Sequence, residues 1–263
     1  MRGRPRPHAA TRIVDRLKLH RRRLRLDRRD YTVVTLRPGT VARYSTNYFH
    51  ATWHIVSDWH GARLLARLLW GLAYQRTPHL LVVIDRPFLD PNPFDGEPAD
   101  PVALVPMTTP WGPKAARDLR RRLPRAGDPD GTVLWRTHGL PAAAGERRPL
   151  WTYPVRDRLR FDRVGGLVTL AADPPALRDT ACAIHRLGEY SYQGMSYVDL
   201  DDWNGEVQVF RDYARRVSAA RVARREVLAG TSDPLPPDSL RPLIWRRTTE
   251  IRHRPRRRAA TAA

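Results

Sequence analysis

The sequence has one cysteine, Cys182, and two lysines, Lys18 and Lys114, among its 263 residues. A single cysteine excludes an intramolecular disulfide and any zinc site with two or more cysteine ligands. Cys182 lies at helical spacing from Leu177 and Ile184, a pattern that indicates a small buried side chain in a helix. A nucleophilic role for this cysteine is therefore not expected.

Several motifs of known chemistry are also missing. No G-x-x-x-x-G-K-[ST] segment is present, which argues against a P-loop nucleotide hydrolase, and no G-x-G-x-x-G segment follows a predicted strand. The G-x-S-x-G motif of many hydrolases is absent as well. With two lysines, neither beside an acidic strand, the acidic-x-lysine arrangement of many restriction-type nucleases cannot form. No helix-turn-helix, zinc-finger or RNA-recognition signature stands out either.

Long apolar runs are the third absence. Arg63 and Arg67 interrupt the longest candidate for a membrane-spanning helix. The basic N-terminal segment is not followed by the apolar stretch of a secretory signal. We therefore expect a soluble, cytoplasmic protein without a membrane span.

Positive charge, by contrast, is abundant and unevenly placed. The formal net charge is +20, and 45 of the 47 basic residues are arginine. Residues 1–29 hold 12 basic against two acidic residues, and residues 241–263 hold eight against one, so the two ends carry +17 and residues 30–240 about +3. Part of the arginine excess fits the codon usage of a GC-rich genome. The guanidinium group nevertheless binds phosphates and carboxylates through paired hydrogen bonds, so basic ends that attract polyanions are expected.

Composition and periodicity divide the chain into three parts. Residues 1–29 are expected to form a basic arm that includes an amphipathic helix from Thr11 onward. Residues 30–230 form an α/β body, and residues 231–263 a proline-containing linker with an arginine-rich tail. No internal repeat is present.

Local patterns within the body predict alternating strands and helices. Hairpins are expected over residues 31–44, around Pro38 and Gly39, and over residues 158–172, around Gly165 and Gly166. The predicted helices cover residues 58–76, 113–123, 174–187 and 204–229, the predicted single strands residues 80–85 and 132–136, and the predicted loops residues 86–113 and 137–149. The fold class predicted is α/β (or α+β), with a mixed sheet, β-hairpins and flanking helices around a single core.

Two histidines suggest, but do not complete, a metal site. His50 and His54 in HATWH have the i, i+4 spacing that would place both imidazoles on one helix face. The glutamate of the H-E-x-x-H motif is missing. We therefore interpret the two histidines as part of a partly buried aromatic helix, and no metal is expected there.

Aromatic residues near arginines form a second candidate site. Five rings lie within sixteen residues, close to Arg43 and Arg63. Rings between arginines can stack single-stranded bases, but large rings more often fill a core. The sequence favours a core role and leaves a mixed role open for Tyr44, Tyr48, Phe49, Trp53 and Trp59.

Carboxylates form the third candidate site. Asp85 ends a predicted buried strand, the position where α/β folds place ligands. A second acidic group consists of Asp199, Asp201 and Asp202, with Glu206 nearby. If the fold brought the two together, they could hold Mg²⁺ for phosphoester chemistry. The alternative is structural, because Asp201 or Asp202 can cap a helix and Asp85 can pair with a neighbouring arginine such as Arg86 or Arg136.

Three functions remain open from the sequence. The first is a non-catalytic protein that associates with DNA or RNA through its arginine-rich ends. The second is a protein–protein interaction or structural accessory module, for which an acidic protein is a possible partner. The third is a magnesium-dependent phosphoester enzyme that uses the carboxylates above. Apart from that magnesium, no cofactor is expected, and the sequence leaves open whether the protein is an enzyme. The predicted phosphate-binding residues are Arg21, Arg22, Arg23, Arg25, Arg256, Arg257 and Arg258.

Overall fold

The computed structural model describes residues 16–146, 158–187, 194–200, 204–231 and 235–253. The chain clusters into two compact units, one made of residues 1–89 and 100–211 and the other of residues 90–99 and 212–263. The mixed α/β class is confirmed, since the first unit holds two mixed sheets with hairpins and helices. No helix in the described ranges combines the length and hydropathy needed to cross a membrane.

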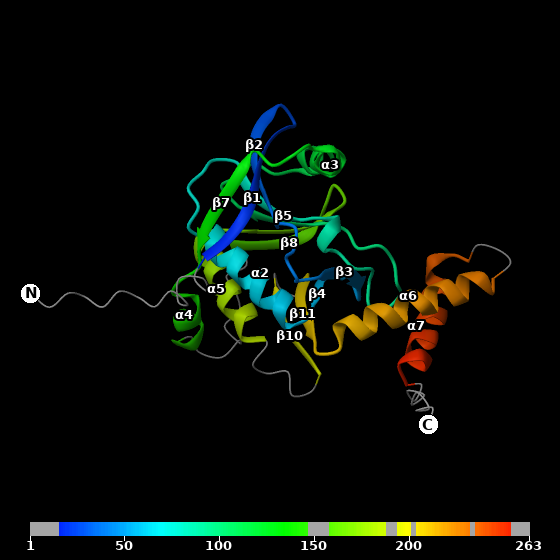
Figure 1. The fold of residues 1–263 in the computed structure, drawn as a ribbon. Helices are drawn as coiled ribbons and strands as arrows, with labels where there is room; N and C mark the ends of the chain where they lie inside the picture. Colours follow the sequence, from blue (N-terminus) through cyan, green and yellow to red (C-terminus); the bar gives the residue numbers. More distant parts are fainter. Residues whose placement is uncertain (1–15, 147–157, 188–193, 201–203, 232–234, 254–263) are drawn as a thin grey trace, which may run out of the picture. The chain divides into compact units, whose positions relative to one another are not determined.

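A seven-stranded sheet forms the larger part of the first unit, with the strand order β7-β1-β2-β5-β6-β9-β8 (Figure 1). The pairs β2/β5 and β6/β9 are parallel and the others antiparallel. The strands are β1 (Arg16–Leu26), β2 (Arg29–Thr35), β5 (Leu80–Ile84), β6 (Val102–Pro106), β7 (Gly131–Arg136), β8 (Leu159–Val164) and β9 (Leu167–Ala172).

Strand β5 shows why this sheet lies inside the unit. All five of its residues are apolar and buried, as expected for a strand covered on both faces. Leu80, Val82 and Ile84 belong to one buried cluster, and Leu81 and Val83 to another. The interior is thus divided into two clusters by the sheet, where the sequence predicted a single core.

Helices cover both faces of the sheet. Helices α2 (Trp59–Leu72) and α5 (Pro174–Arg186) supply the first cluster, and α3 (Pro113–Arg122) supplies the second. Figure 1 shows α3 on one side of the sheet and α2 and α5 on the other. The shorter elements are α4 (Leu140–Glu146), η1 (Arg86–Phe88) and η2 (Leu123–Arg125).

A four-stranded sheet completes the first unit, with the order β10-β11-β4-β3. Its strands are β3 (Tyr44–Phe49), β4 (Thr52–Ser57), β10 (Met195–Leu200) and β11 (Gly205–Phe210). One face, which includes Ile55 and Val207, contributes to the first cluster. Gly205 allows the two sheets to approach each other closely, because a Cβ atom there would overlap the ring of Phe161 on β8.

Several predicted elements are confirmed together with their local causes. The carboxylate of Asp58 accepts a hydrogen bond from the Gly61 amide (2.8 Å) at the start of α2, and Asp173 caps α5 in the same way. Gly165 and Gly166 both have positive φ angles, 58° and 88°, in the β8/β9 turn. The helix over residues 113–123 and the strands over residues 80–85 and 132–136 are also present.

The amphipathic helix predicted within residues 1–29 is wrong over the residues that are described. Residues 16–26 form β1, which pairs with β2 and β7. The helical interpretation relied on apolar residues near helical spacing. Leu17 and Leu19, and then Leu24 and Leu26, instead alternate with basic residues as in a strand.

Two further predictions are wrong because strand pairing is non-local. Residues 31–44 do not form a hairpin, since β2 belongs to the seven-stranded sheet and β3 to the four-stranded one. The helix predicted over residues 204–229 begins as strand β11, and α6 (Tyr213–Ala229) follows it.

Three segments predicted to lack regular structure contain it. Strand β6 lies within residues 86–113, and α4 lies within residues 137–149. Residues 231–263 were expected to form a linker and a tail, but they contain α7 (Pro237–His253). Pro242 lies inside this helix.

The second unit consists of α6, α7 and residues 90–99. Ala223, Leu240 and Ile244 form a small buried cluster between the two helices. Ion pairs join the three parts: Arg221 pairs with Asp90 (3.1 Å), Arg241 with Glu97 (3.4 Å) and Arg247 with Glu226 (2.6 Å).

Candidate nucleic-acid interface

Strand β1 carries basic residues on both faces because its leucines change face halfway along. Leu17 and Leu19 pack against the cluster under α2 and α5. Leu24 and Leu26 pack against the opposite cluster, under α3. Since successive side chains of a strand point to opposite faces, the basic residues between these leucines fall into two separate rows.

The first row lies beside the edge strand β7. In the register of the two strands Arg16 is opposite Arg136, Lys18 opposite Leu134, and His20 opposite Thr132. Arg16, Lys18, Thr132, Leu134 and Arg136 are exposed, and His20 is half-buried. We call this surface the β1–β7 basic face; it is made by Arg16, Lys18, His20, Arg22, Thr132, Leu134 and Arg136.

The β1–β7 basic face is electropositive. Its Arg22 guanidinium donates a hydrogen bond to the Gly127 carbonyl oxygen and opposes the rise in the pKa of Asp85. Among the described residues, no carboxylate forms an ion pair with the basic side chains of β1 or with Arg136. Burial, together with the charges of Arg37 and Arg22, lowers the pKa of His20. A neutral imidazole is thus favoured, because burial and then the charges of the two arginines oppose a further positive charge.

The second row, made by Arg21, Arg23 and Arg25, has acidic neighbours. Arg25 lies opposite Asp30 in the β1/β2 register, and the Arg23 amide donates a hydrogen bond to Asp130. The arginines predicted to act together are therefore divided, with Arg22 on one face of β1 and the other three on the opposite face. The remaining predicted phosphate contacts, Arg256, Arg257 and Arg258, lie outside the described residues.

Arginines of the second unit have a different environment. Six of them form ion pairs with carboxylates of the same unit, so much of the positive charge of these arginines is balanced within that unit. They are Arg216, Arg221, Arg224, Arg241, Arg247 and Arg252. The arginines of the second unit thus differ from Arg16, Lys18 and Arg136, which form no ion pair among the described residues.

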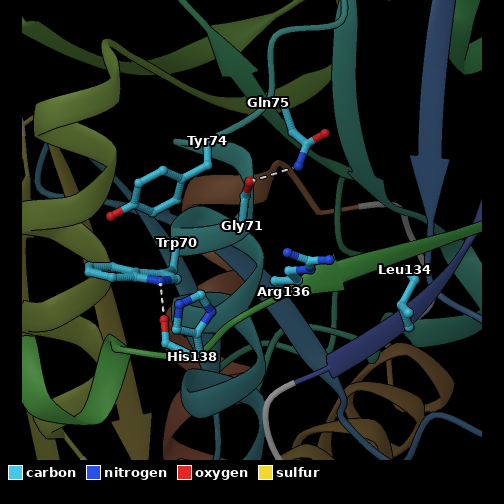
Figure 2. Close-up of a pocket in the computed structure, with 7 residues that line it drawn as sticks. All are labelled: Trp70, Gly71, Tyr74, Gln75, Leu134, Arg136 and His138. Atoms are coloured by element: carbon cyan, nitrogen blue, oxygen red, sulfur yellow. Dashed lines mark hydrogen bonds between the residues drawn. The ribbon is translucent and has the colours of Figure 1, made fainter.

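A pocket opens at the β7 end of the basic face. It has a volume of about 430 Å³ and is lined by residues from the end of α2 and from β7 with the segment that follows it (Figure 2). The lining residues are Trp70, Gly71, Tyr74, Gln75, Leu134, Arg136 and His138. In Figure 2 the rings of Trp70, Tyr74 and His138 lie to one side of Arg136, and Leu134 lies on the other.

The pocket wall is held in place by packing and hydrogen bonds. Trp70 is buried, and its indole N–H donates to the carbonyl oxygen of His138 (3.2 Å). Its ring meets that of Tyr74 edge to face, with the centroids 5.5 Å apart. Gly71 lets the helix approach Trp135 of β7, since a Cβ atom there would lie 2.7 Å from the indole.

Exposed groups in the pocket are aromatic, apolar and cationic. Tyr74 is 55% exposed and Leu134 is 46% exposed, which is unusual for side chains of this size. The Arg178 guanidinium lies 5.6 Å from the centroid of the Tyr74 ring. The chemistry of this wall suits a flat ring that carries a negative charge nearby.

The predicted carboxylates lie in different parts of the first unit. Asp85 follows β5 of the seven-stranded sheet, and Asp199 lies on β10 of the four-stranded sheet. Asp201 and Asp202 lie outside the described residues. Within the described ranges, no group of three His, Cys, Asp or Glu side chains is arranged to hold a metal ion. Burial raises the pKa of Asp85, and Arg22 opposes this effect.

Asp199 belongs to a polar row that crosses the four-stranded sheet. It lies opposite Glu206, which lies opposite His54, which in turn lies opposite Asn47. His54 Nε2 is 3.5 Å from Glu206 Oε2, and His54 Nδ1 is 3.4 Å from Asn47 Nδ2. Gln208 Nε2 donates to the same Glu206 oxygen (2.7 Å).

The geometry of this row favours a structural role. Both ring nitrogens of His54 face protein groups, whereas a catalytic imidazole needs one nitrogen directed at its substrate. Burial, with a smaller contribution from His50, lowers the pKa of His54 to about 4, so the ring is neutral near pH 7. Burial and Glu206 raise the pKa of Asp199.

The helical histidine pair predicted at residues 50 and 54 is wrong. His50 lies in the turn between β3 and β4 with a φ angle of 49°, and His54 lies within β4. The i, i+4 spacing therefore crosses a turn and does not place the two imidazoles on one helix face.

The aromatic residues near Arg43 and Arg63 are divided between interior and surface. Tyr44 is fully buried, and its hydroxyl donates to the Gly61 carbonyl oxygen (2.9 Å). Tyr48 and Trp53 pack ring against ring on β3 and β4, and Phe49 is exposed. Trp59 is exposed under the Arg63 guanidinium, 4.9 Å from the ring centroid.

Comparisons of this chain with models of known protein families, with curated proteins and with solved structures gave no match. The candidate interface is therefore defined by its own residues and their geometry.

Sequence reasoning did not find the pocket. Trp70 and Leu134 were interpreted only as parts of a predicted helix and a predicted strand. No pattern in the sequence singled out Tyr74, and Arg136 was considered as a partner of Asp85. One sequence signal could have indicated the pocket. Thr132, Leu134 and Arg136 are two residues apart in a strand, so an apolar and a cationic side chain share one face.

Proposed function

We propose that this protein binds nucleic acid without catalysis and that the β1–β7 basic face contacts the phosphates. The observation that carries the proposal is the row of Arg16 and Lys18 beside Arg136, which form no ion pair among the described residues; Arg22 continues this row. Unpaired cations on an exposed sheet face are the feature expected of a polyanion-binding surface.

The dimensions of the row support contact with a chain of phosphates. Residues two apart in a strand are separated by about 6.8 Å, so Arg16 to Arg22 spans roughly 20 Å. Arginine forms paired hydrogen bonds with phosphate oxygens, and the binding of several phosphates releases counterions. A protein of this kind binds with an affinity that depends steeply on salt and little on sequence.

The experiment compares two variants of equal charge. Lys18→Gln with Arg22→Gln removes two cations from the β1–β7 basic face. Arg225→Gln with Arg246→Gln removes two exposed arginines that have no described ion pair in the second unit. Binding of labelled single-stranded DNA, RNA and duplex DNA is measured by anisotropy across a salt series.

We expect the β1 variant to bind more weakly and to lower the slope of log affinity against log salt. The decrease is about 0.7 for each lost contact on a single strand and about 0.9 on a duplex. The control variant should retain the slope of the unmodified protein. Equal slopes for all three proteins, or binding that does not respond to salt, would contradict the proposal.

The two alternatives have less support. A magnesium-dependent phosphoester enzyme requires Asp85 and the second acidic group to converge, and Asp85 and Asp199 lie on different sheets. An acidic protein partner would use the same cations as nucleic acid. Competition with polyglutamate separates these cases. If polyglutamate displaces the oligonucleotide at an equal concentration of charge, the result favours an acidic protein as the partner.

A further inference from the structure

We infer that the pocket between α2 and β7 holds one unstacked base, so the protein prefers single-stranded nucleic acid. This inference rests on the proposed function and names the strand form that the same surface takes. Its ligand is a base attached to a phosphate that Arg136 contacts.

The first support is the continuity of the pocket with the basic face. Leu134 and Arg136 belong to both, and their cross-strand neighbours are Lys18 and Arg16. A strand whose phosphates follow β1 therefore reaches the pocket mouth without leaving the cationic surface. The base of the nucleotide at Arg136 is then next to the exposed ring of Tyr74.

The second support is the chemistry of the lining. A base has a flat π-face and an edge of hydrogen-bonding groups, and aromatic side chains bind such faces with little regard to sequence. Tyr74 offers an exposed ring, Leu134 an apolar surface, and Gln75 and His138 are further lining residues with polar groups. Trp70 is buried and tied to the His138 carbonyl oxygen, so it supports Tyr74 as a fixed wall.

The third support concerns the size and position of the cavity. A volume of about 430 Å³ falls in the range of small-molecule sites and is too small for a helical duplex. A base inside a duplex is stacked on both faces and is not available to such a pocket. Single-stranded nucleic acid presents its bases without that cost.

The test uses two probes of about twelve nucleotides, a thymidine oligonucleotide and an abasic oligonucleotide with the same backbone. The variants are Tyr74→Ala and, as the matched control, Tyr197→Ala, which truncates a tyrosine of similar exposure (50%) on β10. Circular dichroism and thermal unfolding check that each variant is folded. Duplex DNA of the same length is the third probe.

We expect the unmodified protein to prefer the thymidine oligonucleotide over the abasic one. Tyr74→Ala should weaken binding of the thymidine oligonucleotide about tenfold and leave the abasic probe and the salt slope unchanged. Tyr197→Ala should behave like the unmodified protein. Equal losses for both probes, equal losses in both variants, or a stronger preference for duplex DNA would overturn the inference.

Failure of the inference can be told apart from failure of the proposed function. If Tyr74→Ala has no effect while the Lys18 and Arg22 variant shows the expected lower salt slope, phosphate binding stands and base capture is wrong. If binding never responds to salt or to the Lys18 and Arg22 substitutions, the proposed function itself is wrong.

Discussion

At the scale of single residues, His54 shows how burial selects a protonation state. Its imidazole is almost fully buried between Asn47 and Glu206 on the four-stranded sheet. The Asn47 amide donates to Nδ1, so the proton lies on Nε2 and faces the Glu206 carboxylate. Burial lowers the pKa of His54 to about 4, because desolvation penalises the charged ring, and His50 adds a smaller effect in the same direction.

This depressed pKa predicts acid sensitivity. The unfolded chain takes up a proton on His54 near pH 6.5, whereas the folded chain resists it until about pH 4. The contribution of the neutral His54 to the free energy of unfolding is therefore fully present above pH 6.5. It is lost progressively as the pH falls toward 4. The free energy of unfolding should drop by about 2–3 kcal/mol over that interval from this residue.

The measurement is urea unfolding of the unmodified protein and of His54→Gln between pH 7 and 4.5. Glutamine keeps an amide donor toward Glu206 and does not titrate, so its stability curve should be flatter. His60→Gln, which changes an exposed histidine, should follow the unmodified protein. Asp199 works in the opposite direction, since its raised pKa favours the folded state in acid, but it is present in all three proteins. Parallel curves for His54→Gln and the unmodified protein would show that His54 titrates normally.

At the scale of elements, the approach of α2 to β7 builds one wall of the pocket. Gly71 lies in the last turn of α2, against the buried indole of Trp135. A glycine in a helix costs about 1 kcal/mol relative to alanine, so close packing must compensate for it here. The helix and the edge strand are thereby held at a fixed distance.

Gly71→Ala is expected to lower the free energy of unfolding by about 1–3 kcal/mol. The added methyl group would lie 2.7 Å from a ring carbon of Trp135, which is enclosed and cannot move aside. The matched control is Gly145→Ala in α4, where the added methyl group meets no atom within 4 Å. That change should be neutral or stabilise by up to about 1 kcal/mol. Denaturant unfolding measures both, and an equal gain in the two variants would contradict the packing interpretation.

At the scale of the whole molecule, a net charge of +20 is not a measure of binding capacity. In the second unit arginines pair with carboxylates of residues 90–99 and of the helices themselves. Asp95 is 2% exposed, and Arg241 Nε lies 3.6 Å from its carboxylate. Burial raises the pKa of Asp95, and Arg241 and Arg224 oppose that rise. The positive charge here stabilises structure, whereas on β1 it remains available.

Arg241→Gln is therefore expected to destabilise the second unit. The change leaves a buried carboxylate with less compensation, and the free energy of unfolding should fall by about 2 kcal/mol, since Arg224 still contributes. Hydrogen exchange of the α7 amides measures the effect. Arg246→Gln, on the same helix and without a described ion pair, should leave exchange unchanged. Unchanged exchange in Arg241→Gln would show that the ion pairs contribute nothing.

Local signals in the sequence were sufficient where a short segment determines its own conformation. The helix starts near residues 58 and 174 and the Gly165-Gly166 turn depend on neighbours within a few residues, and all were predicted. The hairpin at residues 31–44 and the helix at residue 204 failed because their strands pair with segments far away in the chain. The grouping of Arg21 with Arg22 failed for a related reason, since the two side chains point to opposite faces of the sheet.

By itself, the sequence determined the mixed α/β class, the helices over residues 113–123 and 174–187, the Gly165-Gly166 turn, and the surplus of positive charge. Only the tertiary structure decided which of the arginines remain exposed and unpaired. The physical reason is that α3 covers one face of β1 at its far end, while α2 and α5 cover the opposite face at its near end. The uncovered face beside β7, and the pocket at its edge, exist only after those distant helices have packed.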